Sequence, residues 1–413
     1  MEISFLGAAQ EVGRSCMLIE TGADKIMMDC GLKIHTESPY PVQPPAQPDY
    51  VIASHAHLDH TGFLPALYRN GTPELICTPP TLALAEIIIE DSIRIMAKRG
   101  EYPFKVQHMK RMSNSATLLS YNKKHNVGDS EVTLFNAGHI PGAAFTQVDD
   151  GNRRIVYTGD FKGEATKTTF AMEVPPKGPD VLITESTYSD KDHPKRKELE
   201  MEFGRQVTET LENGGTVLLP AFAIGRTQEL IRIIRTVNKD VDIYVDGMGW
   251  RVSETLSHFS SYINEFKPLR RDTQSCKPIL HKNDRKKVLQ KPCVIIATAG
   301  MLQGGPALSY LLQLGPESKA IFTGYCVQET NGYNLLNSGY VEYDGVKIKP
   351  KAPHSYLDFS AHAGRSELFE LCERLQPDRI LCVHGDRCAE FAEELKLEGY
   401  EAYAPALGER IEI

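Results

Sequence analysis

Tyr50-Val51-Ile52-Ala53 is a short apolar run expected to form a buried strand, and Ser54-His55-Ala56-His57-Leu58-Asp59-His60 follows it directly. Imidazole nitrogens and carboxylate oxygens are the ligands that Zn²⁺ and similar divalent cations accept in proteins. Four such side chains within six residues are more than one tetrahedral ion takes when ligands from elsewhere in the chain join. We therefore expect two metal ions here, the first two histidines binding one and the Asp59–His60 pair the other. The alternative is a polar turn whose histidines are satisfied by hydrogen bonds.

Further candidate ligands stand at the ends of other expected strands. His139, Asp160 and His384 each come shortly after a buried apolar run and next to glycine. Because strand ends along one edge of a sheet present their side chains to a common point, we expect these three to join the first segment. Asp29 also ends a strand, and we expect it to orient a ligand histidine rather than to be a plain turn aspartate.

The composition excludes several classes of protein. The chain has 413 residues, a net charge of −8 and 41% hydrophobic residues, which excludes a globally basic nucleic-acid binder and fits a chain with a sizeable core. No apolar run approaches the roughly 18 residues of a membrane span, and the N-terminus lacks the pattern of a signal peptide. The nine cysteines are scattered and contain no C-x-x-C pair, so we predict a reducing, cytoplasmic location.

The secondary-structure pattern predicts an α/β chain with one domain inserted into another. The first third reads as short strands, whereas strands alternate with helices after Tyr188, which indicates a parallel sheet covered by helices. The expected limits are 1–187 for the first part of the outer domain, 188–350 for the insertion, and 351–413 for the C-terminal part of the outer domain.

The series Asp29, His55–His60, His139, Asp160 and His384 resembles the ordered motifs of the metallo-β-lactamase superfamily. This resemblance implies a four-layer αβ/βα sandwich. It also implies that Asp160 bridges two Zn²⁺ ions, and that the remaining ligands divide into one group of His55, His57 and His139 and another of Asp59, His60 and His384.

Two later segments resemble the β-CASP branch of that superfamily, whose inserted domain is found in nucleic-acid nucleases. They are Thr184-Glu185-Ser186-Thr187-Tyr188 and Phe359-Ser360-Ala361-His362-Ala363. Within the branch, a histidine at the position of His384 goes with RNA substrates. The segments Gly7–Ser15, Pro220–Arg226 and Ala299-Gly300-Met301 are most similar to the endonucleases of the cleavage and polyadenylation specificity factor family, including archaeal forms. Because the first expected strand starts at Glu2, a KH-type RNA-binding module ahead of it is not expected.

The resemblance implies a mechanism for hydrolysis of RNA phosphodiesters. A hydroxide between the two metals would attack phosphorus, with Asp59 and the other metal ligands holding the ions. His362 would protonate the leaving 3′ oxygen, Glu185 would orient the ring, and the products would carry a 5′ phosphate. The alternative for His362 is a structural role beside the start of a helix.

Contacts to RNA are less clear from the sequence. Ser360, Thr298 and Gly300 are candidates to bind phosphates, and Arg226 is a candidate either for such a contact or for bracing the inserted domain. We expect single-stranded RNA as substrate, no membrane association, and a homodimer or an RNA-processing complex as a further possibility.

Three other functions compete with a zinc-dependent endoribonuclease. A 5′→3′ exoribonuclease of the ribonuclease J type would use the same metals. A small-molecule metallohydrolase would not require the inserted domain, Glu185 or His362. A non-catalytic RNA-processing scaffold would have lost metal ligands, whereas this chain keeps all of the expected ones.

Overall fold

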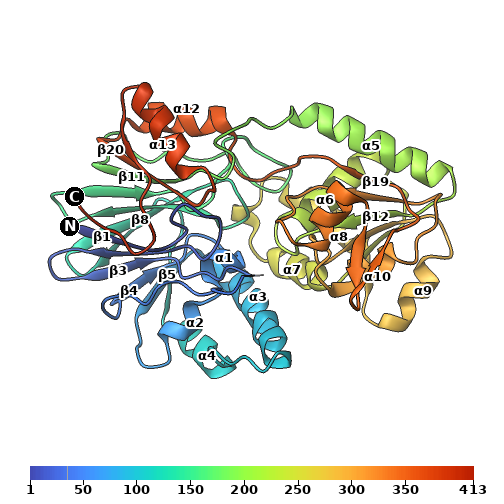
Figure 1. Cartoon of the computed structure of the whole chain (residues 1–413), viewed down its shortest axis with the longest axis horizontal. Coiled ribbons are helices and arrows are strands. Elements are labelled where there is room, and N and C mark those ends of the chain that lie inside the picture. The colour runs from blue at the N-terminus through green and yellow to red at the C-terminus, as the bar shows by residue number, and fades with distance from the viewer. Residues whose placement is uncertain (35) are drawn as a thin grey trace. The chain divides into compact units, whose positions relative to one another are not determined.

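Residues 1–34 and 36–413 are described by a computed structural model, and they form two units (Figure 1). The first unit contains Met1–Ala165, Thr169–Asp192 and Ala361–Ile413, and the second contains Thr166–Thr168 and His193–Ser360. The predicted α/β class is confirmed. The predicted domain limits, residues 188 and 350, stay predictions beside these bounds.

Two seven-stranded sheets form the centre of the first unit. Buried side chains of both sheets, among them Phe5 and Ile52 from one and Val148 and Ile183 from the other, pack into one hydrophobic core. Face-to-face packing of this kind gives a sandwich of two sheets. In order across the first sheet the strands are β22 (Arg410–Glu412), β1 (Glu2–Gly7), β2 (Cys16–Glu20), β3 (Lys25–Met28), β4 (Tyr50–Ile52), β5 (Glu74–Cys77) and β6 (Ala116–Leu118). Across the second they are β21 (Glu401–Tyr403), β20 (Arg379–Val383), β11 (Val181–Glu185), β10 (Arg154–Tyr157), β9 (Ala144–Asp149), β8 (Ser130–Asn136) and β7 (Lys124–Val127).

Helices flank the sandwich within the first unit (Figure 1). The longest, α3 (Pro79–Lys98), begins where the Thr78 side chain accepts a hydrogen bond from the Thr81 amide at 3.3 Å. Pro79 and Pro80 occupy the first turn, where a missing amide donor costs nothing. The others are α1 (Leu58–Thr61), α2 (Leu64–Leu67), α4 (Val106–Asn114), α12 (Arg365–Leu375) and α13 (Cys388–Leu397).

The directions of the strands bring several strand ends to one edge of the second sheet. β10, β11 and β20 are mutually parallel neighbours, so their carboxyl ends lie together. β8 runs antiparallel to β9, which is antiparallel to β10, so β8 ends at the same edge. The residues that follow these four strands are therefore brought close to one another.

The second unit is built on a six-stranded, all-parallel sheet, as the alternation of strands and helices predicts. Alternate side chains of β12 enter different hydrophobic clusters, Leu219 on one face and Leu218 on the other, so both faces are covered. The strand order is β14 (Lys277–Ile279), β13 (Ile243–Asp246), β15 (Val294–Ala297), β12 (Val217–Pro220), β16 (Lys319–Phe322) and β19 (His354–Tyr356). The helices are α5 (Arg196–Glu212), α6 (Arg226–Val237), α7 (Met248–Leu256), α8 (Phe266–Gln274), α9 (Arg285–Val288), α10 (Gly305–Leu311) and α11 (Asn331–Ser338), and β17 (Val341–Tyr343) pairs with β18 (Val346–Ile348).

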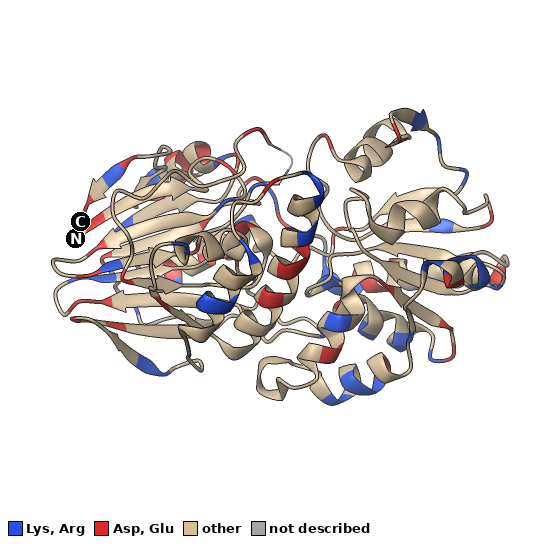
Figure 2. Cartoon of the chain, turned by 90° about the horizontal axis from the view of Figure 1, so that it is seen from below, with Lys and Arg blue, Asp and Glu red and all other residues tan. Residues whose placement is uncertain are grey.

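Charged side chains of both signs are mixed with one another, as the net charge of only −8 suggests. Figure 2 shows basic and acidic residues interspersed along the helices, while the central strands carry few of either.

Among the described residues, no helix combines the length and apolar character needed to cross a bilayer. The nine cysteines are buried as free thiols, which is the ordinary behaviour of a small apolar side chain.

Candidate metal centre

The turn that carries His55, His57 and His60 is fixed by close contact with a neighbouring loop. The amides of Cys30 and Leu32 donate to the carbonyls of His60 and Leu58, at 2.8 and 2.9 Å. Between them lies Gly31, where an added Cβ would stand 1.7 Å from the Asp59 carbonyl oxygen. Only a residue without a side chain allows this approach, so the loop and the turn hold each other in place.

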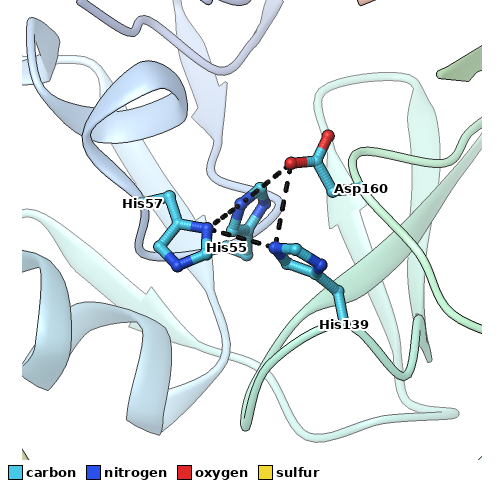
Figure 3. Close-up of side chains that lie close together, drawn as sticks. All are labelled: His55, His57, His139 and Asp160. Carbon is cyan, nitrogen blue, oxygen red and sulfur yellow. Dashed lines mark hydrogen bonds and ion pairs between the residues drawn. The ribbon is translucent and has the colours of Figure 1, made fainter. Parts of the chain in front are cut away.

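Three imidazoles and one carboxylate meet at a common point, here called the His55 cluster (His55, His57, His139 and Asp160; Figure 3). His57 Nδ1 lies 3.2 Å from His55 Nε2 and 3.1 Å from His139 Nε2. Asp160 Oδ2 lies 3.5 Å from His55 Nε2 and 3.8 Å from His139 Nε2. All four side chains come from the ends of β4, β8 and β10, which is the convergence that the sequence predicts.

A second group, here called the His60 cluster (Asp59, His60, Asp160 and His384), lies on the other side of the same aspartate. Asp160 Oδ1 is 3.3 Å from His60 Nε2 and 3.8 Å from His384 Nδ1. Asp59 Oδ2 is 3.7 Å from His384 Nε2, and 32% of the Asp59 side chain is exposed. The two oxygens of Asp160 therefore face different clusters.

The donor set fits divalent cations. Asp160 Oδ1 and His384 Nε2 are buried and have no hydrogen-bond partner among the described residues. Buried polar atoms are normally satisfied, so a pair of such atoms at one place indicates a missing partner. In addition, His139 donates its Nδ1 hydrogen to the Ala361 carbonyl at 2.8 Å, which leaves a lone pair on Nε2 inside the cluster.

Asp29 contacts one of these histidines, and its expected role in orienting a metal ligand stays a prediction. Its Oδ2 is 2.7 Å from His60 Nδ1, which directs His60 Nε2 into the cluster. Asp29 also accepts hydrogen bonds from the Ser54 amide and hydroxyl, both at 2.7 Å, and from the Tyr157 hydroxyl at 2.9 Å. Sequence reasoning missed Ser54 and Tyr157. The only signal for them was their position beside His55 and at the end of β10.

His362 and Glu185 form a pair next to the His55 cluster. His362 Nδ1 is 2.9 Å from Glu185 Oε2 and 3.9 Å from Asp160 Oδ2. Glu185 is itself fixed, because its Oε1 accepts the Phe161 amide at 2.8 Å. The His362 side chain is 23% exposed, whereas the side chains of His55, His60, His139 and His384 are at most 2% exposed.

The protonation states follow from burial and from the nearest charges. Burial holds the pKa values of His55, His57 and His139 below the ordinary range, so these rings are neutral at pH 7 and available as ligands. Burial would raise the pKa of Asp160, but the surrounding histidines outweigh it and hold that pKa well below its usual range. For His362, burial works to lower the pKa, yet Glu185 and Asp160 together raise it to about 9.

The residues predicted to contact RNA lie in the second unit. Arg226 is buried and its guanidinium donates to the Phe359 carbonyl, which is the contact that a bracing role requires. Gly300 packs against the backbone of Ala221 and Phe222. Ser360 donates its amide to Asp358 at 3.2 Å. For Ser360, Thr298, Gly300 and Arg226, RNA binding stays a prediction.

Three family models match the chain in succession. Residues 9–192 match the metallo-beta-lactamase superfamily, residues 227–335 the Beta-Casp domain, and residues 345–405 the Zn-dependent metallo-hydrolase RNA specificity domain. A crystal structure of a protein of unknown function from Enterococcus faecalis V583 aligns with 99% of this chain and 99% of its own, with a TM-score of 0.62. At 14% identity, this likeness concerns the fold alone.

Two relatives are similar over the whole of this chain. It is 36% identical over 428 residues to the probable RNase MJ4 of Methanocaldococcus jannaschii, and the alignment covers 100% of both chains. It is 33% identical over 424 residues to the RNase aCSPSF2 of Saccharolobus solfataricus, with 100% of this chain and 85% of the relative covered. The chain therefore belongs to the metallo-β-lactamase superfamily, in its β-CASP ribonuclease branch, and is a metal-dependent hydrolase that acts on RNA.

Proposed function

We propose that this chain is a zinc-dependent endoribonuclease that holds one metal ion in the His55 cluster and a second in the His60 cluster. The observation that carries the proposal is the position of Asp160. Its Oδ2 lies 3.5 Å from His55 Nε2 and its Oδ1 lies 3.3 Å from His60 Nε2, so one carboxylate is placed to serve both clusters. Imidazoles together with carboxylates favour zinc over the hard cations Mg²⁺ and Ca²⁺, which prefer oxygen ligands alone.

The ions and the protein residues would have separate tasks. When bound, the cations would supply positive charge to the phosphodiester and lower the pKa of water to about 7. His362 is the candidate to donate the proton that the leaving 3′ oxygen needs, since Glu185 lies 2.9 Å from its Nδ1 and, together with Asp160, raises its pKa to about 9 against burial. Cleavage with the 3′ oxygen as the leaving group leaves a 5′ phosphate and a 3′ hydroxyl.

A pair of single-stranded RNAs tests the endonucleolytic mode. One is linear and labelled at its 5′ end, and the other is a circle of the same sequence. We expect the zinc-loaded chain to cut the circle and to release labelled fragments of intermediate length from the linear RNA. An intact circle together with labelled mononucleotides would identify a 5′→3′ exoribonuclease instead.

The metal part of the proposal has its own measurement. Elemental analysis of the chain purified without chelator should give two zinc ions per chain, and Asp160→Ala should lower both metal content and cleavage. Gln147→Ala is a suitable control, because Gln147 is buried on β9 of the same sheet and belongs to neither cluster.

The single-stranded preference, homodimerisation, membership of an RNA-processing complex and a cytoplasmic location stay predictions.

A further inference from the structure

The loop Gly7–Ser15, between β1 and β2, has a strained backbone that the proposed mechanism does not use. Ala8, Gln10 and Arg14 have φ angles of 54°, 54° and 46°, in the left-handed region that residues with a side chain rarely adopt. Strain of this kind persists only where the surrounding structure imposes it. Because backbone strain is common at functional sites, we expect this loop to have a function.

Contacts at both ends of the loop impose this conformation. An added Cβ at Gly7 would lie 1.8 Å from the Arg14 carbonyl oxygen, so the two ends of the loop touch. The Arg14 guanidinium bonds the Glu11 carboxylate at 2.5 Å and donates to the carbonyls of Ser38 and Tyr40 at 2.9 and 3.1 Å. The loop is thus a rigid platform within the first unit.

This platform holds His384 at two points. The His384 amide donates to the Ala8 carbonyl at 2.7 Å, and the Ser15 hydroxyl oxygen lies 2.8 Å from His384 Nδ1. His384 has a φ of 48° itself, so its backbone also needs outside support. No other hydrogen bond to a His384 ring nitrogen is found among the described residues, since Nε2 is without a partner.

Ser15 also contacts the segment of Asp59 and His60 and the loop that follows Asp29. Its amide donates to the Asp59 carbonyl at 2.8 Å, and its carbonyl accepts the Gly31 amide at 2.9 Å. Its hydroxyl oxygen is 3.4 Å from His60 Nε2, and the residue is 0% exposed. One buried serine therefore contacts His384, the turn of Asp59 and His60, and the loop that follows Asp29.

We propose that Ser15 is a positioning residue for the metal of the His60 cluster, acting through His384; this rests on the proposed pair of metal ions. The hydroxyl oxygen accepts the hydrogen of His384 Nδ1, which leaves the lone pair on Nε2, the nitrogen that faces Asp59. His60 has a carboxylate in this role and His139 a backbone carbonyl, whereas His384 has a neutral hydroxyl. Ser15 thus contributes orientation without adding charge.

The test compares Ser15→Ala with Ser4→Ala. Ser4 is a buried serine on β1 of the same sheet, and its hydroxyl has no partner among the described residues, so Ser4→Ala matches the loss of a buried hydroxyl without loss of a contact. Both variants and the wild type are stripped of metal and titrated with Zn²⁺ by calorimetry, and with Co²⁺ by visible absorption. Loss of a group that orients a metal-bound histidine typically weakens metal binding 10–100-fold.

We expect one of the two equivalents to bind Ser15→Ala as it binds the wild type, and the other to bind about 10–100-fold more weakly with an altered Co²⁺ spectrum. Ser4→Ala should bind both equivalents normally. Unchanged binding of both equivalents to Ser15→Ala would overturn the inference. This is the result expected if His384 bound the metal through Nδ1. Equal weakening of both would show a general structural role and also overturn it. A wild type that binds a single equivalent would instead contradict the metal pair itself.

Discussion

His362 differs from His55, His60, His139 and His384 in the exposure of its side chain. Its side chain is 23% exposed and is paired with Glu185, whereas the side chains of those four are at most 2% exposed. If it acts as the general acid and not as a ligand, His362→Ala should keep both metals and lose about 10²–10⁴-fold in cleavage rate. The measurements are zinc per chain and single-turnover cleavage of labelled RNA.

His125→Ala is the matched control for that variant. His125 is 29% exposed, lies in the same unit and pairs with Glu74 at 3.2 Å, but belongs to no candidate metal group. It should cleave at the wild-type rate. Loss of zinc from His362→Ala alone would show that His362 is a ligand and that its assignment as an acid is wrong.

The Glu185 carboxylate gives a second prediction, on the pH dependence. Glu185 and Asp160 raise the pKa of His362 to about 9 against the effect of burial, so the acidic form is present below that pH and is lost as pH rises. Bound cations would lower this pKa in every variant. Glu185→Gln keeps an oxygen for the Phe161 amide but removes the charge, so the alkaline fall in rate should begin at lower pH than in the wild type. A profile of single-turnover rate against pH measures the shift, and an unmoved alkaline limb would contradict the role given to Glu185.

At the scale of elements, the metal turn depends on close approach of two backbone segments. An alanine at Gly31 would place Cβ 1.7 Å from the Asp59 carbonyl oxygen, so one segment must move. We expect Gly31→Ala to lower the free energy of unfolding by about 1–3 kcal/mol and to weaken metal binding in the His60 cluster. Gly22→Ala is the control, since nothing lies within 4 Å of a Cβ there. Urea unfolding and zinc titration of both variants test this, and equal behaviour of the two would contradict it.

The bounds of a helix or strand can be predicted from the sequence where its buried residues form a regular apolar pattern. A continuous apolar run predicts a strand at Arg154–Tyr157 and an apolar stripe predicts a helix at Arg226–Val237, and β10 and α6 have these bounds. For the next helix, the sequence predicts Phe203–Glu212. α5 begins earlier, at Arg196, because its first turns are mostly charged and only Leu199 there is buried. β9 was not predicted, since Thr146 and Gln147 interrupt its apolar residues although both are buried.

The same reasoning explains which parts of the site the sequence could give. Histidine and aspartate at strand ends are rare enough to stand out, and the structure brings those residues together in two clusters. Ser54 and Tyr157, which orient them, are ordinary residues with no local pattern, and Ser15 lies in a segment that carries the family resemblance without indicating a role for the serine. Their roles depend on partners up to hundreds of residues away, so only the folded chain reveals them.

For the whole molecule, metal removal should affect one unit and spare the other. All candidate metal groups found among the described residues lie in the first unit, and the second unit has hydrophobic clusters of its own. A ligand at 100 times its dissociation constant stabilises the folded state by about 2.7 kcal/mol, which is about 5–11 °C in Tm for a unit of this size. A chelator should therefore lower the melting temperature of the first unit by a shift of that order.

The single tryptophan makes the two units separable in this experiment. Trp250 lies on α7 in the second unit, so its fluorescence reports the melting of that unit, while far-ultraviolet circular dichroism reports both. With chelator, we expect part of the dichroism transition to move to lower temperature and the Trp250 transition to stay in place. In Asp160→Ala, the dichroism transition should be insensitive to chelator, because the carboxylate shared by both clusters is gone. If the Trp250 transition fell as far as the dichroism transition, the metals would stabilise both units, and their confinement to the first would be wrong.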